Sequence, residues 1–258
     1  SDLYYADIYK VDDEGKPIVA PYGLRKIEAA LIDAGFNAAV IDPDHIDKHI
    51  SHAKAILIGH HDFFAYGPPS SEWWLITGKE PVNRKSLMRL MRKIAALKRK
   101  YGFKIIVGGP AAWQWLWEPE LWEKWGVDTV IDGEAELIIK DIAQKVLNND
   151  ELPRYVYVGP NDVPRIEDIP IIKGASVNGL IEVMRGCPRG CKFCSVTLRP
   201  LRFIPLEMIE KEIIVNVRAG VRHGIIHSED VLLYGAKGVI PQEEPLLKLH
   251  EVFLKYFN

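Results

Sequence analysis

The chain has 258 residues, 48% of them hydrophobic, which is enough for one large domain or two ordinary ones with a substantial core. Its 33 basic and 35 acidic residues give a net charge of −2, without the excess basicity typical of nucleic-acid-binding proteins. No apolar run approaches the roughly 18–20 residues that span a membrane, and the polar, acidic N-terminus does not resemble a signal peptide. We therefore expect a cytoplasmic protein with reduced thiols.

The first 150 residues alternate between short runs rich in Val and Ile and longer segments with helical periodicity. Such alternation predicts an α/β fold in which helices cover both faces of a doubly wound parallel sheet. The predicted helix Arg84–Tyr101 combines an apolar stripe with a face of Lys and Arg that we interpret as solvated. The predicted strands are Tyr5–Val11, Ala38–Ile41, Ala55–Gly59, Lys104–Gly108 and Thr129–Ile131, and the other predicted helices are Leu24–Ala34 and Glu136–Asn148.

Chemically distinctive segments follow three of these strands: GHHDFFAYG, GGPAAWQW and DGEAE. Each segment in isolation is typical of a turn after a strand. Because the carboxyl ends of parallel strands meet at one edge of a sheet, where ligands bind, the three together predict a cofactor site. Its candidate residues are His60, His61, Asp62, Tyr66, Gly108, Gly109, Trp113, Gly133 and Glu134.

A proline-rich stretch with little periodicity, residues 149–178, is interpreted as a linker between two domains. The first domain is then residues 1–148 and the second is residues 179–258. In the second domain we predict strands at Gly179–Met184 and Gly224–Ser228, and helices at Leu206–Ala219 and Glu244–Phe257. This pattern indicates another strand–helix fold with parallel strands.

The three cysteines of the chain, Cys187, Cys191 and Cys194, lie within eight positions directly after a predicted strand. Their clustering around glycine and proline argues against buried structural cysteines. Zinc would need a fourth ligand, for which His223 and His227 are the nearest histidines. Clustered soft thiolates fit an iron–sulfur cluster better, and a four-iron cluster would then keep one iron open to a substrate or cofactor.

The spacing C-x3-C-x2-C, with Phe193 before the last cysteine, resembles the radical S-adenosylmethionine (SAM) enzymes, in which this motif follows the first strand of a partial (β/α) barrel. The GEAE segment and the α/β sequence upstream resemble the subgroup with an N-terminal cobalamin-binding domain. Only two strand–helix units follow the motif, whereas the family's barrel has about six. We therefore expect the chain to be truncated after the first part of the barrel.

The resemblance implies that the three cysteines hold a [4Fe-4S] cluster whose fourth iron binds SAM. An external electron donor such as ferredoxin or flavodoxin would reduce the cluster, and cleavage of SAM would give a radical that abstracts hydrogen from an unknown substrate. The resemblance places Phe193, Glu229 and Asp230 at the SAM site, although the family's Gly-Gly-Glu signature is absent and the two acidic residues also fit a cap. The expected activity is modification, such as methylation, of an unreactive carbon.

For cobalamin, the resemblance implies a ring resting on GHHDFFAYG and a tail that passes Gly108 and Gly109. The motif Asp-x-His-x-x-Gly of many cobalamin domains is absent, so we expect no histidine from it below cobalt. The tryptophans that follow Gly109 are more typical of packing than of a cofactor wall. Two alternatives stay open: a radical SAM enzyme without cobalamin, and a non-catalytic zinc-binding module.

Overall fold

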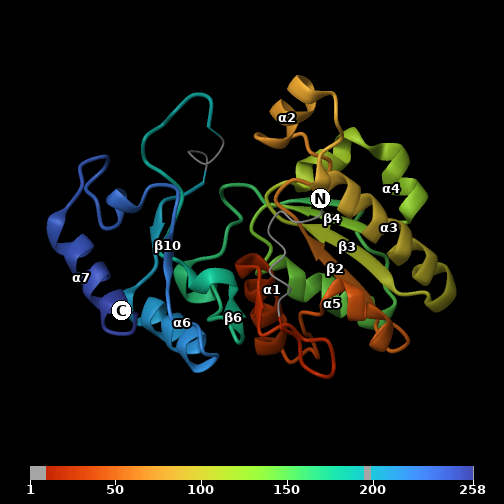
Figure 1. The fold of residues 1–258 in the computed structure, drawn as a ribbon, viewed down its shortest axis with the longest axis horizontal. Helices are drawn as coiled ribbons and strands as arrows, with labels where there is room; N and C mark the ends of the chain where they lie inside the picture. The colour runs from red at the N-terminus through yellow and green to blue at the C-terminus, as the bar shows by residue number, and fades with distance from the viewer. Residues whose placement is uncertain (1–9, 195–198, 258) are drawn as a thin grey trace. The chain divides into compact units, whose positions relative to one another are not determined.

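The computed structural model describes residues 10–194 and 199–257, which form two compact units of mixed α/β structure (Figure 1). The first unit contains the described residues up to Lys16 together with Ile41–Gly159. The second unit contains Pro17–Val40 together with the described residues from Pro160 onward. Each unit is therefore assembled from two separate segments of the chain.

The first unit is built on a parallel sheet with the strand order β2-β3-β4-β5. Gly59 pairs with Gly108 and Asp132 pairs with Tyr157, so neighbouring strands reach their carboxyl ends at one edge of the sheet. This confirms the predicted α/β fold with a parallel sheet. The strands are β2 (Ala55–Gly59), β3 (Lys104–Gly108), β4 (Thr129–Asp132) and β5 (Tyr155–Tyr157).

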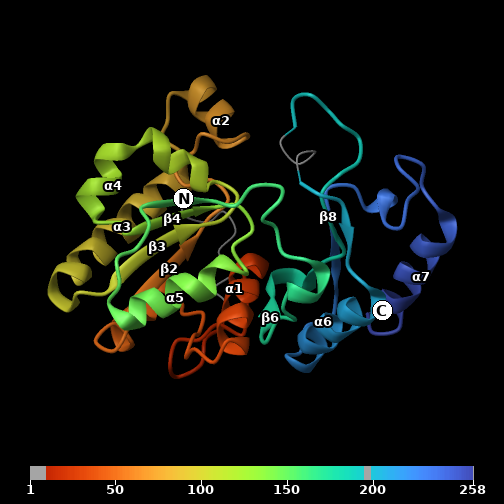
Figure 2. The same cartoon turned by 180° about the vertical axis from the view of Figure 1, so that it is seen from behind.

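Helices cover both faces of this sheet. The helix α3 (Val82–Tyr101) lies in front of the sheet in Figure 1, and α5 (Ile138–Asn148) lies in front of it in Figure 2, seen from behind. Each buries its apolar stripe, as the 3.6-residue periodicity of its sequence predicts. The remaining helical segments are α2 (Ser70–Thr77), α4 (Pro119–Trp125), and the 3-10 helices η1 (Pro43–Lys48) and η2 (Ala112–Trp117).

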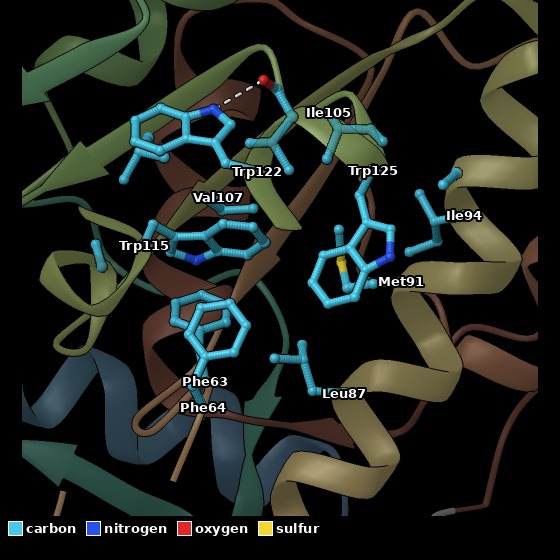
Figure 3. Packing of buried hydrophobic residues seen from close by; sticks show 14 of the residues in the cluster. Phe63, Phe64, Leu87, Met91, Ile94, Ile105, Val107, Trp115, Trp122 and Trp125 are labelled. Carbon is cyan, nitrogen blue, oxygen red and sulfur yellow. Dashed lines mark hydrogen bonds between the residues drawn. The ribbon is translucent and has the colours of Figure 1, made fainter. Parts of the chain in front are cut away.

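The core on the α3 side of the sheet is aromatic (Figure 3). The ring of Trp115 meets that of Phe64 edge-on, with ring centroids 5.0 Å apart, and Phe64 stacks on Trp125. The indole N–H of Trp122 donates to the carbonyl of Val127, at 3.0 Å, so this buried polar group is satisfied. The expectation that tryptophans serve packing is thus confirmed for these three buried indoles.

The second unit contains three two-stranded sheets, two of them parallel. The parallel pair β7–β10 carries the strand–helix–strand connection through α6, and β8–β9 is antiparallel. The elements are β1 (Val19–Ala20), α1 (Tyr22–Asp33), β6 (Ala175–Ser176), β7 (Leu180–Glu182), β8 (Met184–Arg185), β9 (Arg202–Phe203), α6 (Leu206–Arg218), β10 (Ile225–His227) and α7 (Glu243–Leu254), with 3-10 helices η3 (Ile166–Asp168), η4 (Val177–Gly179) and η6 (Val231–Leu233).

Helix α1 is joined to the rest of the second unit by buried charged groups. The ammonium of Lys26 lies 2.5 Å from the carboxylate of Glu212 in α6, and both side chains are buried. The hydroxyl of Tyr22 donates to the same carboxylate, at 2.7 Å. The guanidinium of Arg25, also buried, donates to the carbonyl of Ala175 in β6. These contacts explain why residues 17–40 pack with a part of the chain that follows more than a hundred residues later.

Some predicted elements differ from the structure. The strand predicted at Ala38–Ile41 is wrong, since these residues are loop and the N–H of Val40 donates to the side chain of Glu28 instead of to a sheet. The prediction Tyr5–Val11 lies mostly outside the described residues. The strand predicted at Gly179–Met184 is divided into β7 and β8. The stretch 149–178, predicted to be a linker, contains β5 and β6.

We find no described helix that has both the length and the apolarity required to cross a membrane.

Candidate functional site

The segment between β8 and β9, which carries Cys187, Cys191 and Cys194, is called the cysteine loop; the two strands pair at its base. Arg185 pairs with Arg202 across this antiparallel pair. Just before the loop, the N–H of Val183 donates to the carbonyl of His227 in β10, at 2.9 Å, and the carbonyl of Val183 accepts from the N–H of Ile204. The loop between Arg185 and Arg202 is therefore held at the carboxyl ends of the parallel strands β7 and β10, where α/β folds place ligands.

Two glycines shape this loop. Gly186 has a φ of 79°, and a Cβ added there would lie 2.6 Å from the carbonyl oxygens of Arg199 and Pro200. The outgoing and returning strands of the loop approach so closely at this point that only glycine fits. Gly190 also has a positive φ, 65°, but a Cβ there would meet nothing within 4 Å.

The three cysteines are all half-buried thiols on this one loop. Cys187 packs against the hydrophobic core of the second unit, and the N–H of Cys194 donates to the carbonyl of Cys191 in a tight turn. Phe193, between the last two cysteines, is 92% exposed. Among the described residues we find no group of three or more Cys, His, Asp or Glu side chains placed around one metal-ion position.

Charged side chains flank the loop on both sides. Before it, the buried guanidinium of Arg185 contacts the carboxylate of Glu182 at 2.9 Å. Within it, Arg189 donates two hydrogen bonds to Asp230, at 2.9 and 2.7 Å. These bonds raise the pKa of Arg189, and the nearby Cys187 and Cys191 contribute in the same direction. The loop is thus tied to the residues that follow β10.

The segment after β10 holds the acidic residues that we predict at the SAM site. Glu229 is exposed. Asp230 already has two partners, because it accepts from Arg189 and also from the N–H of Leu232, where it caps η6. Ser228, which the sequence analysis did not single out, has a buried hydroxyl without a hydrogen-bond partner among the described residues. An unpaired buried hydroxyl at this position is a feature that a bound ligand would satisfy.

The second group of candidates lies at the carboxyl edge of the sheet in the first unit. The N–H of His60 donates to the carbonyl of Gly108, and a Cβ on Gly109 would lie 2.9 Å from the carbonyl of His60. A Cβ on Gly133 would lie 2.6 Å from the carbonyl of Val158. The structure therefore brings these residues to one edge, as predicted. The close approach that the glycines permit here is between neighbouring segments of the chain itself.

Asp62 organises the loop that follows β2. Its carboxylate accepts from the N–H of Gly67 at 3.0 Å, from the amide of Gln114 at 2.7 Å and from the amide of Asn83 at 3.1 Å. Although burial alone would raise the pKa of Asp62, these hydrogen bonds, led by that from Gln114, lower it below its ordinary value. Sequence reasoning missed Gln114, which lies one position beyond the predicted Trp113.

His60 is fixed in one tautomer by the same loop. The backbone N–H of Asp62 donates to Nδ1 of His60 at 2.9 Å, so a neutral imidazole carries its proton on Nε2. Burial lowers the pKa of His60 below its ordinary value, and His61 adds to this shift. In this arrangement neither ring nitrogen of His60 offers a free lone pair to a metal. His61 is exposed.

The other candidates at this edge form an aromatic and charged cluster. The hydroxyl of Tyr66 bonds to Glu118, and its ring lies 5.7 Å from that of Trp117. Trp113 meets Trp117 edge-on at 5.0 Å. Arg84 of α3 lies 3.6 Å from Glu118. Glu134 is half-buried in the segment after β4.

Comparison with known proteins shows the fold. No protein-family model matches the chain, and no curated protein does. Among solved structures, the chain is similar to the radical SAM methyltransferase TsrM from Kitasatospora setae, determined with a tryptophan substrate and a SAM analogue bound. The TM-score is 0.59 at 16% sequence identity, over 83% of this chain and 46% of TsrM. The match spans less than half the length of TsrM, and at this identity the similarity shows the α/β fold alone.

Proposed function

We propose that this chain carries the cluster- and SAM-binding part of a radical SAM enzyme. The observation that carries the proposal is the loop with three half-buried thiols at the carboxyl ends of β7 and β10, in a fold similar to that of a radical SAM methyltransferase. The reaction that we propose is modification, such as methylation, of an unreactive carbon in an unknown substrate. The electron donor would be an external protein such as a ferredoxin or a flavodoxin.

The cysteine loop fits a [4Fe-4S] cluster by the chemistry of its donors. Cys187, Cys191 and Cys194 would each bind one iron, and thiolate is the ligand that such clusters require. A reduced cluster supplies the electron that cleaves the sulfonium of SAM. The chain's own contribution is to hold the loop: Gly186 permits its narrow base, and the Arg189–Asp230 ion pair ties it to the segment after β10.

For SAM, we propose that the segment after β10 supplies the protein contacts. The buried hydroxyl of Ser228 would donate to a carboxylate or ribose oxygen of SAM, and exposed Glu229 would accept from its ammonium. Asp230 is a weaker candidate than the sequence alone indicates, because Arg189 and the N–H of Leu232 already occupy its carboxylate. The exposed ring of Phe193 is available to cover the ligand.

For cobalamin, we propose binding at the carboxyl edge of the first unit, without a histidine of the Asp-x-His-x-x-Gly motif below cobalt. His60 does not take that role in the described arrangement, because a histidine that ligates a metal must offer an unprotonated ring nitrogen and His60 uses Nδ1 to accept from the N–H of Asp62. The ring would rest on the loop that Asp62 organises. Titration with hydroxocobalamin tests this, because a bound corrin changes its visible spectrum, and an unchanged spectrum favours a radical SAM enzyme without cobalamin.

The experiment that tests the proposed function is anaerobic reconstitution with iron and sulfide. We expect about four irons and four sulfides per chain, SAM-dependent changes in the spectrum of the reduced cluster, and loss of both in Cys191→Ala. Lys192→Ala, a change of an exposed neighbour on the same loop, serves as the matched control. One bound zinc without inorganic sulfide would instead favour the zinc-binding module.

A further inference from the structure

Helix α3 presents a row of exposed cations that has no counterpart elsewhere in the described structure. Its 20 residues include eight Lys or Arg and not one Asp or Glu. Three of the eight are paired: Arg84 with Glu80, Lys93 with Asp47 and Lys98 with Asp128. The other five are exposed and have no carboxylate partner in residues 10–194 and 199–257. We call these five the α3 stripe: Lys85, Arg89, Arg92, Arg99 and Lys100.

The five cations lie on one side of the helix. At 3.6 residues per turn, the positions i, i+4, i+7, i+14 and i+15 fall within about 100° of the helix circumference. At a rise of about 1.5 Å per residue, the stripe extends over about 22 Å. The opposite side of α3 is buried, with Leu87, Met91 and Ile94 in the core. The stripe is therefore a rigid, outward-facing surface on a packed helix.

The stability of the helix does not explain the stripe. Lys85 and Arg89 are four residues apart and Arg89 and Arg92 three apart, so these like charges repel each other along the helix. Lys85 lies in the first turn, where the helix macrodipole disfavours cations, and no acidic residue lies there. Ordinary solvated helices of this protein look different: α6 and α7 pair Lys211 with Glu207 and Lys248 with Glu244.

We propose that the α3 stripe is the docking surface for an acidic surface of another protein. A row of unpaired cations on a rigid helix complements a row of carboxylates, and such complementarity steers association. A long nucleic acid fits less well, because the chain as a whole has a net charge of −2 and a pI of about 6.5, so phosphates beyond the stripe would be repelled. A local acidic patch on a protein needs attraction only over the stripe.

The test measures by anisotropy the binding of two fluorescently labelled ligands: poly-L-glutamate, the acidic probe, and a 20-nucleotide single-stranded RNA, which represents the nucleic-acid alternative. Each ligand is titrated separately at salt concentrations of about 50 to 300 mM. We expect the probe to bind, with an affinity that falls as salt rises. The triple variant Lys85→Gln, Arg89→Gln, Arg92→Gln should bind it about tenfold more weakly. The matched control, Lys124→Gln, Lys145→Gln, Arg218→Gln, removes three exposed helical cations elsewhere and should bind like the parent.

Three results would overturn the proposal. Equal weakening in the control variant would mean that net charge alone governs binding. Tighter binding of the RNA, lost in the triple variant, would make the stripe a nucleic-acid surface. A lower melting temperature of the triple variant would assign the cations a structural role, whereas relief of like-charge repulsion should leave the melting temperature unchanged or raise it. The charge-conserving pair Arg89→Lys, Arg92→Lys should keep the probe affinity.

Discussion

Substitution of Ser228 distinguishes a binding role of its buried hydroxyl from a structural one, because the two roles predict different changes in the free energy of unfolding. Because it has no hydrogen-bond partner among the described residues, Ser228→Ala should leave the free energy of unfolding unchanged or raise it by up to about 1 kcal/mol. If the hydroxyl donates to SAM, the same variant should bind SAM about tenfold more weakly, the effect of one lost hydrogen bond.

Ser176 is the matched control for Ser228, because its buried hydroxyl donates to the carbonyl of Leu180 at 2.6 Å. Ser176→Ala should lower the free energy of unfolding by about 1 kcal/mol. Chemical denaturation measures both stabilities, and equilibrium dialysis of reconstituted protein measures SAM binding. A Ser228→Ala variant that is destabilised like Ser176→Ala, or that binds SAM like the parent, would contradict the assignment.

The two glycines of the cysteine loop offer a second comparison at the same scale. Both have positive φ, so alanine costs about 1–2 kcal/mol at either position. Only at Gly186 does the added Cβ also clash with backbone oxygens, those of Arg199 and Pro200. We expect Gly190→Ala to lower the free energy of unfolding by about 1 kcal/mol and Gly186→Ala by about 3 kcal/mol or more, with less iron bound after reconstitution. Equal losses in the two variants would show that the loop base is wider than described.

At the scale of elements, the loop after β2 depends on one carboxylate. In the parent, Oδ1 of Asp62 accepts from Gly67 and Gln114, and Oδ2 accepts from Asn83. Asp62→Asn replaces one of these two oxygens by an N–H₂ group, which cannot accept, so at least one donor loses its acceptor. We expect the free energy of unfolding to fall by about 1–3 kcal/mol. Tryptophan fluorescence during urea unfolding reports this, and Glu151→Gln, at an exposed carboxylate, should have little effect. An Asp62→Asn variant with an unchanged free energy of unfolding would mean that water replaces the lost contacts.

The same loop gives a pH dependence with a definite sign. The folded protein lowers the pKa of His60, through burial and then His61, so the unfolded chain binds this proton more readily. Stability from this group is complete above about pH 6.5, the ordinary pKa, and is lost as pH falls through the lower folded value. Protonation of Nδ1 also ends its hydrogen bond from Asp62. Between about pH 7.5 and 4.5, the urea midpoint of unfolding should decline less in His60→Gln than in the parent. Equal dependence of the midpoint on pH in the two proteins would refute the contribution that we assign to His60.

The elements that the sequence predicts well are those whose signal is local. The runs Ala55–Gly59 and Lys104–Gly108 are strands as predicted because each is a continuous apolar segment bounded by turn residues. The run Ala38–Ile41 is also apolar but is loop, because the N–H of Val40 finds its acceptor in the side chain of Glu28. The closure of the cysteine loop by β8 and β9 was not predicted, since two-residue strands leave no periodicity to read.

The same distinction applies to the candidate site. The spacing of the cysteines and the edge shared by His60, Gly109 and Gly133 could be predicted. Both follow from residue spacing and from which segment comes directly after each strand, and these are read along the sequence. Ser228, Gln114 and the partners of Asp230 became visible only with packing. A serine carries no sequence signal that its hydroxyl will be buried and unpaired.

For the whole molecule, the main result is that the second unit is built from two distant segments. Arg25 and Lys26 look like surface residues in an amphipathic helix, yet both are buried. Their burial is possible because Glu28 and Glu212 supply the opposite charges and because backbone carbonyls, such as that of Pro170, accept the remaining protons. The sequence analysis places this helix in the first domain, residues 1–148, and only these pairings assign it to the unit that carries the cysteines.

Removing one partner of this buried pair tests the arrangement of the whole chain. Lys26→Met leaves the carboxylate of Glu212 buried without its cation, so the free energy of unfolding of the second unit should fall by about 3–5 kcal/mol. The double variant Lys26→Met, Glu212→Leu should recover part of this loss, because an apolar pair replaces the ion pair. Amide hydrogen exchange locates the effect: we expect faster exchange in α6 and unchanged exchange in β3. Acceleration in β3 alone would place α1 with the first unit, and a double variant as unstable as Lys26→Met would show that the pair itself is not what joins α1 to α6.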